Sequence, residues 1–175
     1  QRETAVPGDV RYKDLNNDDI IDDKDRTKIG SPWPDFVYGI TLGAAWRGFD
    51  FNVFIQGSQG NDVMNMTLLD FESGTGYMNA KSDYLSRAWN GEGSTDRYHR
   101  ISAVQGDNLL VSDYYLEDGS YARIKNIQLG YDFCNRLIKK NKTISQCRLY
   151  VSAQNLFTFT NYSGLDPEIG SSNAT

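Results

Sequence analysis

The amino-acid sequence predicts an all-β protein built from antiparallel strands. Its composition is rich in aromatic residues (13%) and glycine (16 residues) and poor in proline (4 residues), which is typical of strands joined by many turns and loops. Two stretches, residues 36–59 and 121–160, alternate apolar and polar positions along both of their arms. This alternation fits a transmembrane barrel, whose apolar face meets lipid, and equally a soluble sandwich, whose apolar face meets a second sheet. Periodicity alone leaves these two architectures open.

Length and charge narrow the classes of protein. The chain has 175 residues, enough for one ordinary domain or for a piece of a larger protein. Its net charge of −5 argues against a nucleic-acid partner. It has no run of about 18 apolar residues, so no transmembrane helix is expected. The first residues are polar and do not form a signal peptide, so we expect a mature chain or one that begins inside something longer.

Residues 1–35 are predicted to form an acidic loop, in which seven aspartates fall between Asp9 and Asp25. Oxygen-bearing groups recur there with the spacing of an EF-hand or dockerin-type calcium loop. The candidate metal ligands are the side chains of Asp14, Asn16, Asp18, Asp22 and Asp25 and the carbonyl group of Ile20. Asp19 replaces the usual glycine of such loops, but aspartate tolerates the left-handed backbone conformation needed there. A bound Ca²⁺ would brace the loop; the alternative is a solvated loop shaped by Asx-turns.

Residues 36–59 are predicted to form a hairpin with strands over 36–46 and 49–58 and a two-residue turn at Arg47-Gly48. Such a turn pairs apolar residues on one face of the sheet. The predicted pairs are Trp46 with Phe49, Ala44 with Phe51, Leu42 with Val53, and Ile40 with Ile55. The opposite face carries Thr41, Asp50, Asn52 and Gln56.

Residues 60–120 form a connection too long for an ordinary loop of a compact domain. We expect one short helix there, over residues 80–89. The connection also concentrates aromatic side chains, which stack on sugar rings and anchor interfaces. Candidate contacts with a ligand or partner are Tyr84, Trp89, Tyr98, Tyr114 and Tyr115. The alternative, which we favour for these residues, is that they pack the loop onto itself.

Residues 121–160 are predicted to form a second hairpin, with strands over 121–133 and 147–159. Pairing Tyr131 with Leu149 and Leu129 with Val151 keeps their apolar faces together. Residues 161–175 are polar and are expected to begin another loop. The long segments 1–35, 60–120 and 161–175 then share one end of the sheet, and the shorter connections 47–48 and 135–146 share the other. Outer-membrane barrels show this asymmetry, with the long loops outside the cell.

The residue types needed for catalysis do not gather anywhere in the sequence. His99 is the single histidine, and it has neither a Cys/His cluster for zinc nor a neighbouring acid–nucleophile arrangement. We therefore predict that the protein is not an enzyme and that it needs no cofactor other than the candidate Ca²⁺.

Four segments together resemble the late barrel of SusC/RagA-type TonB-dependent transporters from Bacteroidetes outer membranes. They are residues 7–63, 84–101, 116–133 and 148–170, and they occur in the family's order. The resemblance implies a barrel of about 22 strands with a plug inside. It further implies that TonB energises transport and that a SusD-like surface lipoprotein captures glycans or peptides. The candidate aromatic contacts would then face substrate or this lipoprotein.

This resemblance favours the outer-membrane barrel, with about four strands whose apolar face meets lipid. An isolated sheet of this kind has unpaired edges. We therefore expect the chain to be a C-terminal portion of a transporter, whose plug and TonB-contacting segment lie elsewhere. The alternative is a secreted, calcium-braced β-sandwich that binds carbohydrate.

Overall fold

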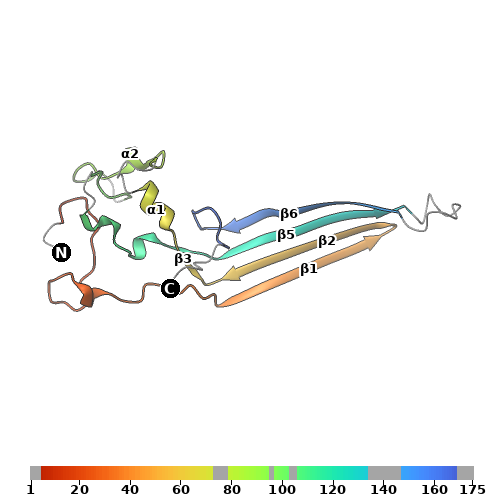
Figure 1. The fold of residues 1–175 in the computed structure, drawn as a ribbon, viewed down its shortest axis with the longest axis horizontal. Helices are drawn as coiled ribbons and strands as arrows, with labels where there is room; N and C mark the ends of the chain where they lie inside the picture. The colour runs from red at the N-terminus through yellow and green to blue at the C-terminus, as the bar shows by residue number, and fades with distance from the viewer. Residues whose placement is uncertain (1–4, 73–78, 95–96, 103–105, 134–146, 169–175) are drawn as a thin grey trace. The chain divides into compact units, whose positions relative to one another are not determined.

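The computed structural model describes residues 5–72, 79–94, 97–102, 106–133 and 147–168 (Figure 1). The chain divides into two compact units. We call Gln1–Gly30 with Met64–Glu117 the loop unit, and Ser31–Val63 with Asp118–Thr175 the sheet unit. No helix among the described residues is both long enough and apolar enough to cross a membrane.

The sheet unit holds one antiparallel sheet of four strands in the order β1-β2-β5-β6, which lie side by side in Figure 1. The strands are β1 (Phe36–Trp46), β2 (Phe49–Gln59), β5 (Tyr121–Asp132) and β6 (Arg148–Thr160). All four predicted strands are confirmed to within one residue at their ends. Since β1 and β6 each pair with a single described strand, this part of the sheet is open at both edges.

The first hairpin has the predicted register, from Trp46 opposite Phe49 through Leu42 opposite Val53. Its turn places both Arg47 (φ 50°) and Gly48 (φ 92°) in the left-handed region. Two positive φ angles are what a type I′ turn requires, and that turn matches the right-handed twist of the strands. The two-residue turn therefore fixes which side chains share a face.

The second hairpin also has the predicted register, with Tyr131 opposite Leu149 and Leu129 opposite Val151. Two irregularities in it were not predicted. The pairing of β5 shifts around Lys125 against both of its neighbours, and Asn155 in β6 has a positive φ of 49°. Such bulges add one residue to a strand and re-aim its side chains. The predicted connection 135–146 lies outside the described residues.

One face of the four-stranded sheet carries exposed apolar side chains. Leu42 is 57% exposed and Val151 is 73% exposed. Val53, in contrast, is buried between its cross-strand partners Leu42 and Ile127. The other sheet in the described part of the chain has only two strands, β3 (Asp62–Met64) and β4 (Leu116–Asp118). A sandwich would need this apolar face to be covered, so the structure does not favour that alternative.

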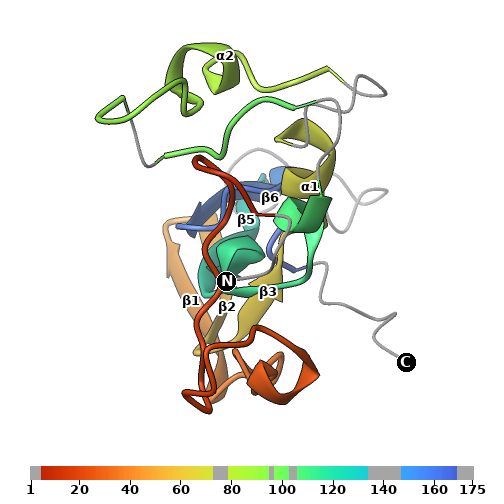
Figure 2. The same cartoon turned by 90° about the vertical axis from the view of Figure 1, so that its left-hand side faces the viewer.

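The loop unit contains short helices rather than a long one. They are η1 (Asp23–Asp25), α1 (Met66–Phe71), α2 (Tyr84–Arg87), η2 (Gly106–Leu109) and η3 (Asp113–Tyr115). Figures 1 and 2 both place η1 and α2 at opposite ends of this unit. The expected helix over 80–89 is wrong in length, because Asp83 provides no side-chain cap and Ala88 is already extended. Helix α1 was not predicted.

Candidate functional site

The aspartate loop, residues 14–25, is held by hydrogen bonds from backbone N–H groups to its own carboxylates. Asp14 accepts from Asn17 N–H at 2.6 Å and from Asp19 N–H at 2.8 Å, one on each oxygen. Asn17 and Asp19 have positive φ angles of 61° and 63°. The expectation that Asp19 tolerates the left-handed conformation at the glycine position is therefore confirmed.

Asp25 joins the two ends of this loop. Its Oδ1 accepts from Leu15 N–H at 2.8 Å, and its Oδ2 accepts from Asp22 N–H at 2.9 Å. These backbone hydrogen bonds, led by the one from Asp22, hold the pKa of the Asp25 carboxyl below its ordinary value. Asp25 therefore stays ionised and closes the loop as an acceptor.

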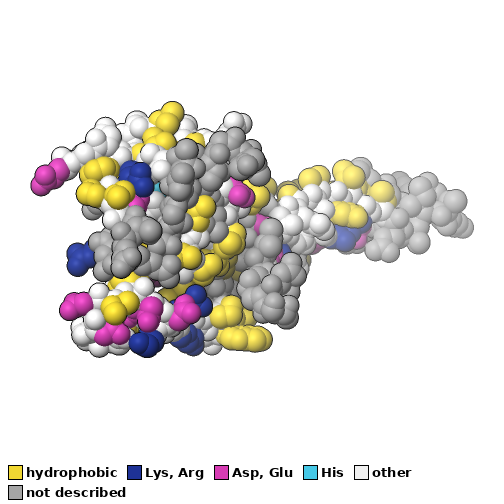
Figure 3. Space-filling view, turned by 60° about the vertical axis from the view of Figure 1, so that its left-hand side comes forward, with side chains coloured by type: hydrophobic (Ala, Val, Ile, Leu, Met, Phe, Trp, Pro, Cys, Tyr) yellow, Lys and Arg dark blue, Asp and Glu magenta, His cyan; other side chains and the backbone are white. Residues whose placement is uncertain are grey.

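The six predicted calcium ligands lie on this one loop, but all five ligand side chains among them already accept local hydrogen bonds. Asp18 Oδ1, for example, accepts from Ile20 N–H at 3.0 Å. Over the described ranges, no group of three or more His, Cys, Asp or Glu is arranged to hold a metal ion. Figure 3 shows acidic side chains gathered at the surface, and calcium binding here stays a prediction.

The structure separates the five candidate aromatic residues into two sets. Tyr84 and Tyr115 are each 1% exposed and Tyr98 is also buried, so these three pack the loop unit internally. The rings of Tyr84 and Tyr98 lie 5.5 Å apart, and the Tyr98 hydroxyl donates to Asp83. Burial favours the packing role for these three, although Tyr98 also lines a cavity of the loop unit. Trp89 and Tyr114 keep partial exposure, so contact with substrate or partner stays a prediction for them.

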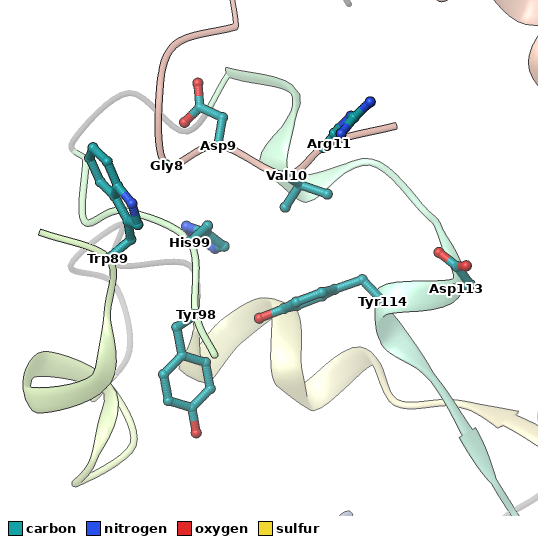
Figure 4. Close-up of a pocket in the computed structure, with 9 residues that line it drawn as sticks. All are labelled: Gly8, Asp9, Val10, Arg11, Trp89, Tyr98, His99, Asp113 and Tyr114. Carbon is teal, nitrogen blue, oxygen red and sulfur yellow. The ribbon is translucent and has the colours of Figure 1, made fainter. Parts of the chain in front are cut away.

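Trp89 and Tyr114 line a cavity of about 690 Å³ within the loop unit. In Figure 4 the imidazole of His99 lies between these two aromatic side chains. The complete lining is Gly8, Asp9, Val10, Arg11, Trp89, Tyr98, His99, Asp113 and Tyr114. The volume falls within the range of about 300–1,000 Å³ that is usual for small-molecule sites.

Asp9 anchors the N-terminal wall of this cavity. Its Oδ1 accepts from Arg100 Nε at 2.7 Å and from Asn108 Nδ2 at 2.9 Å, while its Oδ2 accepts from Val6 N–H at 3.0 Å. Burial alone would raise the pKa of Asp9, but the hydrogen bonds from Val6, Asn108 and Arg100 bring the pKa below its ordinary value. Asp9 is thus a charged, positioning residue of the loop unit.

Sequence reasoning missed this anchor. Asp9 and Asn108 are 99 positions apart, and Asn108 is 1% exposed. The sequence shows only that acidic and amide residues occur in the long connections. It does not show which of these residues form hydrogen bonds with one another.

A separate polar cluster lies in the sheet unit. It surrounds Arg123 of β5, on the face of the sheet opposite the exposed apolar side chains. Arg123 is 6% exposed and donates to Thr158 Oγ1 at 2.7 Å and to Glu168 Oε2 at 2.6 Å. It also pairs with Asp166, and Lys125 pairs with Glu168. The cluster fastens the segment after β6 to the sheet, and it too was not predicted.

Comparison with known proteins identifies the family. No family model matches the chain. It is 38% identical over 162 residues to "TonB-dependent receptor P3" of Formosa agariphila, a match that covers 93% of this chain. It is 30% identical over 171 residues to "TonB-dependent receptor SusC" of Bacteroides thetaiotaomicron, covering 97%. The chain belongs to the SusC/RagA-type TonB-dependent receptors.

A solved structure agrees with this assignment. The structure of the RagAB peptide transporter superimposes on this chain with a TM-score of 0.69 and 30% sequence identity. The match covers 81% of this chain and 15% of the matched RagAB chain. The chain spans about 16% of the length of the TonB-dependent receptors P3 and SusC. TonB-dependent receptors are outer-membrane β-barrel proteins. In such a barrel an exposed apolar sheet face meets lipid, and a polar face meets the lumen.

Proposed function

We propose that this chain forms part of the wall and external loops of an outer-membrane receptor that imports oligosaccharides or peptides. Transport would depend on TonB through a plug outside this chain, and a SusD-like surface lipoprotein would deliver the substrate. The residues of this chain would supply lipid contact, shape and binding surface, and no chemical step.

One observation carries this proposal: a receptor-like sequence forms a sheet with one exposed apolar face and one polar face. The 38% identity to receptor P3 supports the class of protein. The exposure of Leu42 and Val151 on one face supports a wall in lipid. RagAB is a peptide transporter, so peptides stand beside oligosaccharides as candidate substrates.

We also propose that Ca²⁺ braces the aspartate loop. The spacing of its oxygens and the left-handed conformation of Asp19 support this role. The ion would be structural, since the loop already closes through Asp14 and Asp25.

Uptake by whole cells tests the proposed function. Cells that carry the full receptor, cells without it and cells without TonB would each be given fluorescent oligosaccharides or fluorescent peptides. The proposal predicts uptake of one of the two classes, and loss of this uptake in both deletion strains. Equal uptake in all three strains would contradict it. Purification of the full receptor should also bring down a SusD-like lipoprotein.

A further inference from the structure

The turn of the first hairpin exposes a cation in an unfavourable backbone conformation. Arg47 has a φ of 50°, whereas two-residue turns of this type strongly prefer Asn, Asp or Gly at that position. A larger side chain in the left-handed region costs conformational free energy, and such costs concentrate at functional sites. The backbone of the turn therefore does not explain why an arginine occupies this position.

The side chain of Arg47 stacks on an aromatic ring. Its guanidinium carbon lies 4.8 Å from the ring centre of Trp46, which is close enough for a cation–π contact. The turn itself is fastened to β5, because Asp132 N–H donates to the backbone oxygen of Gly48 at 2.8 Å. Gly48 also lies against Tyr131, whose ring would be 3.3 Å from a Cβ there. The sheet thus fixes the point from which the arginine side chain extends.

The rings beside this turn belong to one row across the apolar face. Trp46 lies opposite Phe49, Phe49 lies opposite Tyr131, and Tyr131 lies opposite Leu149. The rings of Phe49 and Tyr131 are 4.5 Å apart, and Trp46 is 68% exposed. In a barrel wall, such a row lies at the boundary between the hydrocarbon and the lipid headgroups. Arg47, one residue beyond the row, would then reach the headgroups.

The charges at this end of the sheet favour an anionic partner. Strands β1 and β5 end here, and β2 and β6 begin here (Figure 1). No carboxylate of the described residues forms an ion pair with Arg47, and the nearby Asp50 pairs instead with Arg148 on the polar face. The other connection at this end, residues 134–146, has four basic residues and no acidic residue in its sequence. A phosphate group complements this charge, and a guanidinium can bind phosphate through two parallel hydrogen bonds.

We propose that Arg47, stacked on Trp46, binds the phosphate group of a membrane phospholipid whose acyl chains lie along the apolar face of β1 and β2. The proposal rests on the proposed position of the sheet as a wall in lipid. An aromatic row is general in such walls, whereas the phosphate site is specific to the Arg47 turn. The contact would hold this end of the sheet at a fixed depth in the membrane.

The test uses the full receptor purified in detergent, and native mass spectrometry measures the affinity for the first bound lipid. The probes are phosphatidylglycerol, whose phosphate is its only charged group, and diacylglycerol with the same acyl chains. We expect Arg47→Asn to weaken binding of phosphatidylglycerol about three- to fivefold and to leave binding of diacylglycerol unchanged. Arg47→Lys, which keeps the charge, should lose less. Arg26→Asn, the same kind of exchange at an exposed arginine of the loop unit, is the matched control.

Thermal stability separates a lipid site from a structural role of the arginine. Asparagine suits the left-handed turn, so Arg47→Asn should unfold at a temperature no lower than that of wild type. Equal affinity of wild type and Arg47→Asn for phosphatidylglycerol would overturn the proposal. A lower unfolding temperature together with equal loss of both lipids would assign Arg47 to the turn and would overturn it as well.

Cellular uptake separates this failure from failure of the proposed function. A wild-type receptor that imports its substrate but binds phosphatidylglycerol no better than Arg47→Asn does contradicts the phosphate site alone. A wild-type receptor that imports nothing contradicts the proposed function instead.

Discussion

Arg148 of β6 reaches over the intervening strand β5 to pair with Asp50 of β2. Its Nε lies 3.0 Å from Asp50 Oδ1, and the ion pair passes above Gly130. A Cβ at Gly130 would lie 2.5 Å from the Asp50 carboxylate and 2.9 Å from the Arg148 guanidinium. The glycine therefore leaves the space in which two strands that are not neighbours are joined across the polar face.

Replacement of Gly130 by leucine should break this pair and lower the thermal transition of the full receptor. The side chain has no room unless the ion pair opens. An exposed pair by itself contributes at most about 1 kcal/mol, so most of the loss would come from strain. The temperature at which the folded barrel shifts to its unfolded position in gel electrophoresis measures this loss of stability. Gly43→Leu is the matched control, because the nearest atoms to a Cβ there are 3.9 Å away; an equal loss in both variants would contradict this account.

Arg123→Ala should destabilise the receptor more than Arg123→Lys does. Removal of the buried guanidinium leaves the carboxylates of Asp166 and Glu168, each 34% exposed, beside each other without their cation. The cost should lie between the ~1 kcal/mol of a surface pair and the ~3–5 kcal/mol of breaking a buried one. Lysine keeps the positive charge, but it cannot reproduce the hydrogen bonds of the guanidinium to Thr158, Asp166 and Glu168. Limited proteolysis after β6 reads out the release of the segment. If both variants resist protease as wild type does, the cluster does not hold that segment.

Asp9→Asn should destabilise the loop unit at neutral pH. It should also make the stability of the loop unit less dependent on pH in the acidic range. The folded pKa of Asp9 lies below its ordinary value of 3.8. Its contribution to stability is therefore present above that value and is lost as the pH falls through the lower, folded pKa. Protease resistance of loop 64–117 in the full receptor, measured from neutral pH to pH about 3, should show this acid-dependent part in wild type only. Asp23→Asn, at an exposed position, should behave as wild type does.

Calcium should give a binding isotherm with the full receptor that disappears in the double variant Asp14→Ala/Asp18→Ala. Both side chains belong to the predicted ligand set, and removal of two carboxylates from such a loop abolishes its charge complementarity. Asp23→Ala leaves that set intact and is the control. Identical traces for all three proteins would show that the aspartate loop closes through its own hydrogen bonds alone.

The strands were predictable because one local rule decides each of them. Two-residue alternation sets the faces, and the Arg47-Gly48 turn sets the register of the first hairpin. The irregularity around Lys125 and Asn155 was not predictable, because a bulge depends on pairing with both neighbouring strands at once. Alternation also could not show that Val53 would be buried while Leu42 stays exposed.

The sites were less predictable than the fold. The aspartate loop lies within one short stretch, so its turns could be read from residue types. The anchor of Asp9 on Arg100 and Asn108 joins positions far apart in the chain, and no sequence pattern marks it. The sequence shows which aromatic residues the long connection contains, but not which of them are buried. Tyr84 is buried, whereas Trp89 is partly exposed and stays a candidate for contact with substrate or partner.

In the full receptor, we expect the four-stranded sheet to form a barrel wall with its apolar face in lipid. Spin labels placed one at a time at Leu149, Tyr150, Val151 and Ser152 of β6, in the full receptor in lipid bilayers, test it most directly. We expect alternation: labels at Leu149 and Val151 collide with oxygen dissolved in the lipid, and those at Tyr150 and Ser152 collide with a water-soluble nickel complex. Uniform access of the nickel complex to all four positions would contradict the account.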